Sequence, residues 1–194
     1  MPATRDADAT KARILTAATS EFARYGLAGA RVDRIADAAE ANKSLIYSYF
    51  GNKDDLFDRV VEEAFTELHE AVPLTPRDME GYATSLFDYL ADHPELRRVD
   101  AWRRLERPAA TESERSAYAG KVADLTEVRQ TYGKNDEFLP ADVISLVIAI
   151  ASAWTNTPDA LQPHTTQDRE QQRELVRRVV SVLTRSQRRP RTTG

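Results

Sequence analysis

Apolar residues recur along most of the chain at intervals of three and four positions, which is the spacing of one face of an α-helix. Near the N-terminus, Ile14, Ala18 and Phe22 follow this spacing. The hydroxyl of Thr10 suits the N-cap of such a helix, and Gly26 suits its end. The pattern therefore predicts a first helix from about Thr10 to Gly26.

Two much shorter helices are predicted next. Apolar residues at i, i+3, i+4 and i+7 fall between Val32 and Ala39. Asn42 suits the N-cap of a third helix, in which Ile46 and Phe50 lie one turn apart and face inward. Each of these helices is about two turns long.

After a break at Gly51 and Asn52, the pattern continues as a long fourth helix. Pro73 and Pro76 then mark a boundary, because proline does not continue a helix. Five more helices are predicted at about 77–92, 95–106, 112–132, 140–155 and 168–187. No convincing alternation of polar and apolar residues predicts a strand, so we expect an all-α fold of about nine helices.

The eighth and ninth predicted helices carry apolar residues on more than one face. A single chain of this size is not expected to cover a helix on every side, so we expect two copies to pair through these helices in a symmetric four-helix interface. The expected interface residues are Val143, Val147, Ile150, Val176, Val179, Val180 and Leu183. The alternative is that these residues fill a core within one chain.

The composition is that of a globular, cytoplasmic protein. Of the 194 residues, 41% are hydrophobic, 30% are charged and none is cysteine, which excludes disulfides and thiolate metal sites. The first residues lack the apolar segment of a signal peptide. The longest apolar run, from Val143 to Trp154, is interrupted by serines and is too short to span a bilayer. We therefore expect no membrane partner.

The charge is distributed unevenly along the chain. The whole chain has a formal net charge of −4, yet residues 1–53 carry eight Lys or Arg against six Asp or Glu. A mildly basic N-terminal part on an acidic body has the polarity needed to approach a phosphate backbone.

The second and third helices are separated only by Glu40 and Ala41. Two short helices joined by a tight turn and supported by a longer first helix form a helix-turn-helix, whose second helix enters the major groove of DNA. Ile46 and Phe50 anchor this helix. The residues left for its outer face are Lys43, Ser44, Leu45, Tyr47, Ser48 and Tyr49.

Residues 11–57 resemble the DNA-binding domain of the tetracycline-repressor (TetR) family of transcriptional regulators. The family pattern I/L-Y-x-Y/H-F-x-x-K-x-x-L occurs here as IYSYFGNKDDL. The residues that match, in the same order and with the same gaps, are Ile14, Leu15, Ala17, Ala18, Phe22, Gly26, Val32, Ile35, Ala36, Ala39, Lys43, Ile46, Tyr47, Tyr49, Phe50, Lys53 and Leu56.

The resemblance implies a homodimeric repressor that binds a palindromic operator and is released by a small molecule. It divides the chain into a DNA-binding domain at 1–55 with a disordered arm at 1–9, a connecting helix at 56–72, a ligand-binding and dimerisation domain at 73–187, and a basic tail at 188–194. It also implies a ligand pocket, for which the candidate residues are Tyr82, Leu86, Trp102, Tyr118 and Trp154. The connecting helix is the expected lever between ligand and DNA.

Three residues depart from the family pattern. Arg31 stands where a Ser or Thr N-cap is common, so it loses the cap but offers a charged contact to phosphate. Glu40 replaces the turn glycine and places an acid near DNA. Leu45 stands where a small residue is common.

The helix-turn-helix and the resemblance together predict which residues meet DNA. Leu45 either touches a thymine methyl group or packs against a neighbouring helix, and Tyr47 either reaches DNA or packs inward. Lys43 is expected at a phosphate or at a guanine edge. Tyr49 is expected at a phosphate and Lys53 at the backbone near the start of the fourth helix. The predicted DNA-binding residues are Arg31, Lys43, Ser44, Leu45, Tyr47, Ser48, Tyr49 and Lys53.

Two other functions compete with DNA binding. An enzyme is disfavoured because the three histidines, His69, His93 and His164, have no glutamate three positions before them and no Gly-rich phosphate loop occurs. We therefore expect no catalytic site, metal or cofactor. A scaffold whose helix-turn-helix binds protein instead of DNA stays open because of Glu40. The effector, the operator sequence and the direction of regulation stay undetermined by the sequence.

Overall fold

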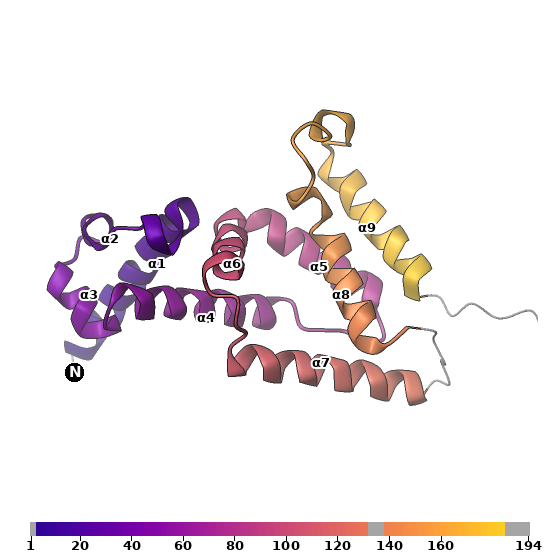
Figure 1. The fold of residues 1–194 in the computed structure, drawn as a ribbon. Helices are drawn as coiled ribbons and strands as arrows, with labels where there is room; N and C mark the ends of the chain where they lie inside the picture. The colour runs from indigo at the N-terminus through magenta and orange to yellow at the C-terminus, as the bar shows by residue number, and fades with distance from the viewer. Residues whose placement is uncertain (1–2, 132–137, 185–194) are drawn as a thin grey trace, which may run out of the picture. The chain divides into compact units, whose positions relative to one another are not determined.

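The computed structural model describes residues 3–131 and 138–184, and over these residues the fold is entirely helical (Figure 1). The predicted basic tail at 188–194 lies outside the described residues. The α-helices are α1 (Ala3–Gly29), α2 (Val32–Ala38), α3 (Lys43–Phe50), α4 (Lys53–Ala71), α5 (Met79–Asp92), α6 (Pro94–Glu106), α7 (Glu112–Thr131), α8 (Pro140–Ala151) and α9 (Arg169–Thr184). Two short 3-10 helices, η1 (Ala153–Thr155) and η2 (Gln162–His164), lie between α8 and α9. The all-α fold and the nine predicted helices are confirmed for the described residues.

The chain divides into two compact units. The first contains Met1–Glu70 and Asp92–Ala110, and the second contains Ala71–Ala91 and Thr111–Gly194. This division differs from the domain at 73–187 expected from the sequence, because α6 packs against α1 and belongs to the first unit.

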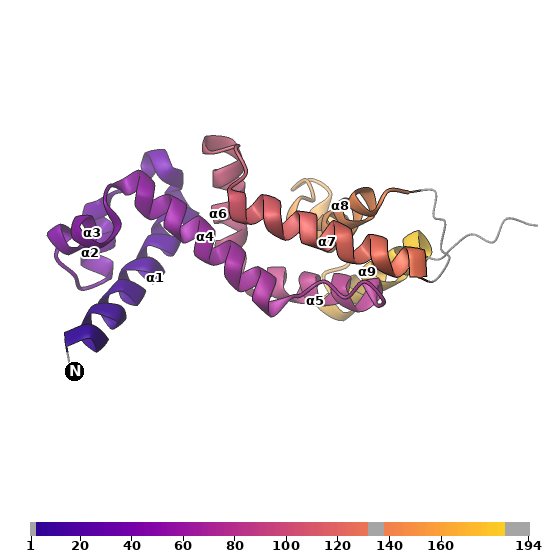
Figure 2. The same cartoon turned by 90° about the horizontal axis from the view of Figure 1, so that it is seen from below.

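The core of the first unit is built from the apolar faces of α1 to α4. Ile14, Phe22, Ile35, Ile46 and Phe57 are almost wholly buried in it. The rings of Phe22 and Phe57 meet edge to face at 5.0 Å, so α1 and α4 are joined at the centre of the core. Figure 2 shows α2 and α3 close together beside α1, in agreement with the contacts between consecutive helices.

The first helix starts earlier than predicted. Residues 3–9 are helical, so the expected disordered arm at 1–9 is wrong for the part that the structure describes. Thr10 does not cap the helix, because it lies inside it and its hydroxyl donates to the Asp6 carbonyl at 2.8 Å. Asp6 lies in the first turn, where the helix dipole favours a negative charge.

Gly26 interrupts α1, as its position in the sequence predicts. Its φ of 67° is in the left-handed region, which a residue with a side chain rarely adopts. Glu106 at the end of α6 accepts the N–H groups of Leu27 at 2.6 Å and Ala28 at 3.2 Å, so its carboxylate caps the turn after the break. A Cβ atom at Gly26 would lie 2.8 Å from ring carbons of Trp102.

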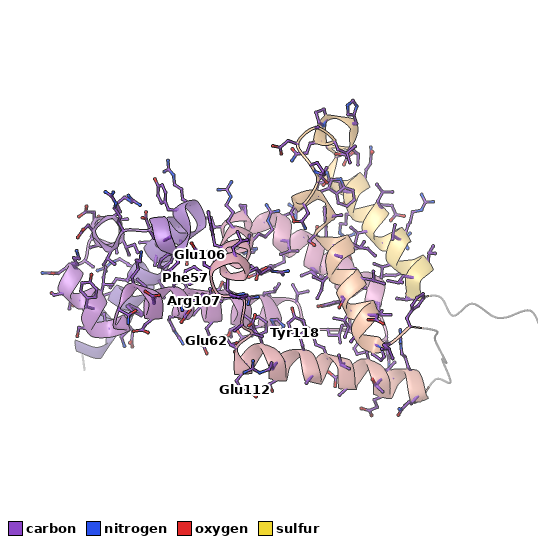
Figure 3. All side chains as sticks on the ribbon, viewed as in Figure 1. Phe57, Glu62, Glu106, Arg107, Glu112 and Tyr118 are labelled. Atoms are coloured by element: carbon purple, nitrogen blue, oxygen red, sulfur yellow. The ribbon has the colours of Figure 1, made fainter. Side chains whose placement is uncertain are left out.

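The neighbour of Glu106 holds α6 to a different helix. The guanidinium of Arg107 forms an ion pair with Asp54 in the first turn of α4. Figure 3 shows Glu106 and Arg107 at the end of α6 and Phe57 on α4. Two consecutive residues therefore join α6 to α1 and to α4 within the first unit.

In the second unit, α8 packs against α7 and α9 (Figure 1). Ion pairs join α5 to α9. Asp88 of α5 pairs with Arg173 of α9 at 2.8 Å, and Glu80 pairs with Arg177 at 3.0 Å. The helix predicted at 140–155 ends at Ala151. The side chains of Thr155 and Asn156 donate to the Ser152 carbonyl here, and such bonds compete with the helical pattern.

The burial of α8 and α9 corrects most of the expected dimer interface. Four of its residues are at most 1% exposed within one chain, and they are Val143, Val147, Val176 and Val180. These four residues fill a core within one chain, which is the alternative that the sequence left open. Ile150 and Leu183 are half-buried, and Val179 is 49% exposed. The large apolar residues that stay exposed on these helices are Leu146, Leu175, Val179 and Val182.

The break in α1 gives a testable prediction. Gly26→Ala should lower the free energy of unfolding by roughly 2–4 kcal/mol, because it combines a left-handed φ with a clash against Trp102. Gly120→Ala is the matched control, because Gly120 lies inside α7 and a Cβ there meets nothing within 4 Å. This control should gain about 0.5–1 kcal/mol. Urea unfolding followed by circular dichroism measures both, and equal stability of the two variants would contradict the prediction.

Candidate nucleic-acid interface

The turn between α2 and α3 has a fixed backbone. The N–H of Ala41 donates to the Ala36 carbonyl at 3.0 Å, and the Nε of Arg13 on α1 donates to the Ala39 carbonyl at 3.2 Å. Glu40 has a φ of 48°, the only positive value among the described residues other than glycine. The turn therefore keeps the backbone shape that suits glycine, although the residue is glutamate.

The third helix begins as predicted. The side chain of Asn42 accepts the Ser44 N–H and the Ser44 hydroxyl, each at 2.9 Å, which confirms Asn42 as the N-cap. Ile46 is 1% exposed and Phe50 packs against the same core, which confirms the inner face of the helix. The orientation of α3 is therefore set by the cap at one end and by two apolar anchors.

The start of α2 is held by a residue that the sequence did not single out. Arg31 occupies the N-cap position without a side-chain cap bond. Glu21 of α1 instead accepts the Arg31 N–H at 2.9 Å and the Arg34 Nε at 2.8 Å. Burial raises the pKa of Glu21, but the hydrogen bonds from Arg34 and from the Arg31 N–H lower it to a value below that of an ordinary glutamate. An ionised carboxylate on α1 thus fixes α2.

Arg31 and Lys43 lie exposed at the starts of the two helices. In the part of the chain that the structure describes, no partner is seen for the Arg31 guanidinium. The ammonium of Lys43 pairs with Asp33 of α2 at 2.7 Å, which raises the pKa of Lys43. Both groups of this pair face solvent, and exposed pairs contribute little to stability. A phosphate group can therefore replace Asp33 as the partner of Lys43.

The outer face of α3 exposes two large apolar side chains. Leu45 is 37% exposed and Tyr47 is 45% exposed, so the alternatives in which either residue packs inward are wrong. Ser44 and Ser48 lie between them around the helix and are also exposed. Four of the predicted DNA-binding residues thus share one surface.

Tyr49 and Lys53 lie differently from the other predicted residues. The Tyr49 ring is half-buried against the core, and the Lys11 ammonium of α1 lies 5.4 Å from its centre. The Lys53 ammonium donates to the Ala30 carbonyl at 3.2 Å, which ties the start of α4 to the loop before α2. Both side chains already have roles within the first unit.

The residues predicted for a ligand pocket do not all come together. Tyr82 and Leu86 are buried on α5, and Trp154 packs against Phe87 at 5.9 Å, all within the second unit. Tyr118 of α7 is 39% exposed. Trp102 belongs to the first unit, where its ring covers Gly26, so the structure does not place it with the other four.

A lysine that the sequence did not indicate joins two of these tyrosines. The Lys121 ammonium donates to the Tyr82 hydroxyl at 3.1 Å and lies 5.3 Å and 5.7 Å from the ring centres of Tyr82 and Tyr118. Burial and the nearby Tyr118 raise the pKa of Tyr82 to about 12, and burial lowers the pKa of Lys121. The position of Lys121 in the sequence does not indicate this contact, because a lone lysine on a polar helix is usually solvated.

The described residues contain no cluster of three or more acidic or histidine side chains that is placed to bind a metal ion. Within the same residues, no helix is both long enough and apolar enough to cross a bilayer.

Two family models match the chain. Residues 14–60 match the bacterial regulatory proteins of the tetR family, and residues 78–181 match the tetracyclin repressor-like C-terminal domain. The first match contains the helix-turn-helix, and the second contains α5, α6, α7, α8 and most of α9.

Similar proteins are transcriptional regulators. The chain is 46% identical over 154 residues to the HTH-type transcriptional repressor SCO4008 of Streptomyces coelicolor, a match that covers 77% of this chain and 80% of that protein. It is 32% identical over 99 residues to the HTH-type transcriptional repressor NicS of Pseudomonas putida, which covers 47% of each. The structure of the putative transcriptional regulator SCO4942 from Streptomyces coelicolor superposes with a TM-score of 0.81 at 36% identity, over 90% of this chain and 97% of that one. With its helix-turn-helix and both family matches, the chain belongs to the TetR family of bacterial transcriptional regulators.

Proposed function

We propose that the protein is a homodimeric transcriptional repressor that binds a palindromic operator through α3 and is released by a small molecule. The observation that carries the proposal is the outer face of α3. It is exposed, it is rigidly held by Asn42 and Ile46, and it is flanked by the cations Arg31 and Lys43. A repressor is favoured over an activator because SCO4008 and NicS are both named as repressors.

In this proposal, the contacts to DNA divide by chemistry. Arg31 and Lys43 contact phosphates, which supply affinity without sequence information. Leu45, Tyr47 and Ser48 face the floor of the major groove, where the bases are distinguished. Tyr49 and Lys53 act mainly by holding α3 and α4, because their side chains are engaged within the first unit.

The effector would bind in the second unit. The cluster of Tyr82, Tyr118 and Lys121 combines two aromatic rings with one half-buried cation, which suits recognition of a small molecule. Release from DNA requires that the effector favour a state in which the recognition helices are misplaced. Within the first unit, α4 and α6 are the levers that support the helix-turn-helix, because Arg107 and Glu106 join α6 to α4 and α1.

Dimerisation would use the exposed side of α8 and α9. Leu175, Val179 and Val182 lie at i, i+4 and i+7 and form one exposed stripe along α9, and Leu146 is exposed on α8. A two-fold dimer places two copies of α3 at successive major grooves. Each copy reads one half-site, so the specificities of the two copies combine.

The primary test is genome-wide DNA capture with the intact protein, followed by affinity measurements on the captured site at several salt concentrations. We expect a palindromic site. The logarithm of the affinity for this site should fall linearly with the logarithm of the salt concentration. Arg31→Ala should weaken binding to all sequences and reduce the salt slope by about two, about one for each protomer of the dimer. Arg115→Ala removes the same charge from an exposed position of α7 and should change neither quantity. If the protein captures no DNA and retains a protein partner instead, the helix-turn-helix binds protein and the proposal is wrong.

Glu40 permits a test that separates backbone strain from charge. Glu40→Gly should raise the free energy of unfolding by about 1 kcal/mol, because glycine accepts the φ of 48° without strain. Glu40→Gln keeps the strain, so its stability should stay near that of the wild type. Both variants should bind the operator more tightly at low salt, because each removes a negative charge beside DNA. Unchanged affinity in both variants would place Glu40 away from the phosphates.

The dimer proposal is tested by sedimentation. Val179→Glu should yield particles with the mass of one 21.8 kDa chain at micromolar concentration, because it puts a charge into an apolar contact. Ser85→Glu adds the same charge at an exposed position of α5 and should leave the dimer intact. A Val179→Glu protein that stays dimeric and folded by circular dichroism would require a different interface.

A further inference from the structure

Only one side chain of helix α3, Lys43, can read a base pair through paired hydrogen bonds. Its sequence, KSLIYSYF, contains no Arg, Asn, Gln, Asp or Glu. Arginine and lysine recognise guanine, asparagine and glutamine recognise adenine, and the acidic residues accept from cytosine. Its one cation, Lys43, lies at the start of the helix, where it pairs with Asp33 and where the proposed function assigns it to a phosphate.

The two serines supply little additional recognition. The Ser44 hydroxyl is engaged by the cap, because it donates to Asn42 at 2.9 Å. Ser48 is exposed but offers a single hydroxyl, which accepts from or donates to several bases and discriminates weakly. The hydrogen-bonding capacity of this surface is therefore small and unspecific.

Most of the surface that α3 presents is apolar. Leu45 and Tyr47 are exposed on either side of the serines. Ile46, which separates these two residues in the sequence, points to the core and is 1% exposed. A single exposed leucine needs no explanation in general. Here, however, it lies on the face that enters the groove, where it is the largest group besides Tyr47. The major groove has one apolar feature in ordinary DNA, the C5-methyl group of thymine.

We infer that the protein recognises its operator through the C5-methyl groups of thymines, with Leu45 and Tyr47 as the residues that determine specificity. This inference rests on the proposed DNA binding and adds the chemical feature that is read. Each half-site then contains thymines at the positions that face Leu45 and the edge of the Tyr47 ring. Phosphate contacts fix the register in which these side chains meet the bases.

Replacement of thymine by deoxyuridine tests the inference, because it removes the methyl group and keeps every hydrogen bond. Each thymine of the captured site is replaced in turn, at the same position in both half-sites, and affinity is measured at fixed salt. Loss of one buried methyl group corresponds to about a fourfold change in affinity, so a contacted position should show a loss on the order of fifteenfold for the two half-sites. The remaining thymines should change affinity less than twofold.

Variants then assign each methyl group to a side chain. Leu45→Ala should abolish the deoxyuridine effect at one position, and Leu45→Met, which keeps an apolar side chain, should retain it. Tyr47→Ala should abolish the effect at a second position, and Tyr47→Phe should retain it. Leu45 and Tyr47 are exposed, so thermal unfolding of these variants should match that of the wild type.

The outcomes separate the inference from the function on which it rests. Wild-type protein that binds no operator overturns both. Tight operator binding that is insensitive to deoxyuridine at every position overturns the thymine readout and leaves the repressor proposal standing. A deoxyuridine effect that persists unchanged in Leu45→Ala or Tyr47→Ala overturns the assignment to that residue.

Discussion

A nearly buried carboxylate on α1 determines where the helix-turn-helix begins. Glu21 accepts the N–H of Arg31, the N-cap residue of α2, and a hydrogen bond from the guanidinium of Arg34, and these bonds hold the start of a helix that lacks a side-chain cap. Charge-assisted hydrogen bonds of this kind are stronger than neutral ones, and leaving the acceptor unpaired costs about 1–3 kcal/mol. The absence of a local cap also leaves the Arg31 side chain exposed and available to phosphate. The contacts of Glu21 therefore position α2 and leave the guanidinium of Arg31 exposed at the start of this helix.

The count of basic residues overstates the charge available for DNA. Lys53 is bonded to the Ala30 carbonyl, Arg34 to Glu21, and Arg13 to the Ala39 carbonyl. These cations hold backbone groups of the helix-turn-helix in place instead of facing outward. The first unit therefore uses much of its positive charge as internal support. The exposed face of α3 is mainly apolar. Such a surface contributes more to the specificity of binding than to its affinity.

Local pattern predicted the short helices well and long-range contacts poorly. The Asn42 cap, the Ile46 anchor and the Gly26 break all follow from residues within one or two turns of each other. Glu21 and Glu106 could not be found in this way, because they meet Arg31 and Leu27 from 10 and 79 residues away. An acid on a helix surface has the same sequence appearance whether it is solvated or caps another element.

The same limitation explains the expected dimer interface. Periodicity showed that α8 and α9 are apolar on several sides, but it did not show which side their own chain covers. Val176 and Val180 share one side of α9 and are buried, whereas Leu175, Val179 and Val182 share another and are exposed. Only the packing of α9 on α8 and its ion pairs with α5 distinguish the two stripes.

The connection of α6 to two helices has a consequence for control of DNA binding. Glu106 caps α1 after the Gly26 break, and the next residue, Arg107, pairs with Asp54 at the start of α4. Because the two residues are adjacent, a shift of the end of α6 changes the supports of α1 and α4 together. In the proposed function, an operator that selects the arrangement seen here would weaken any effector that selects another, and by the same factor.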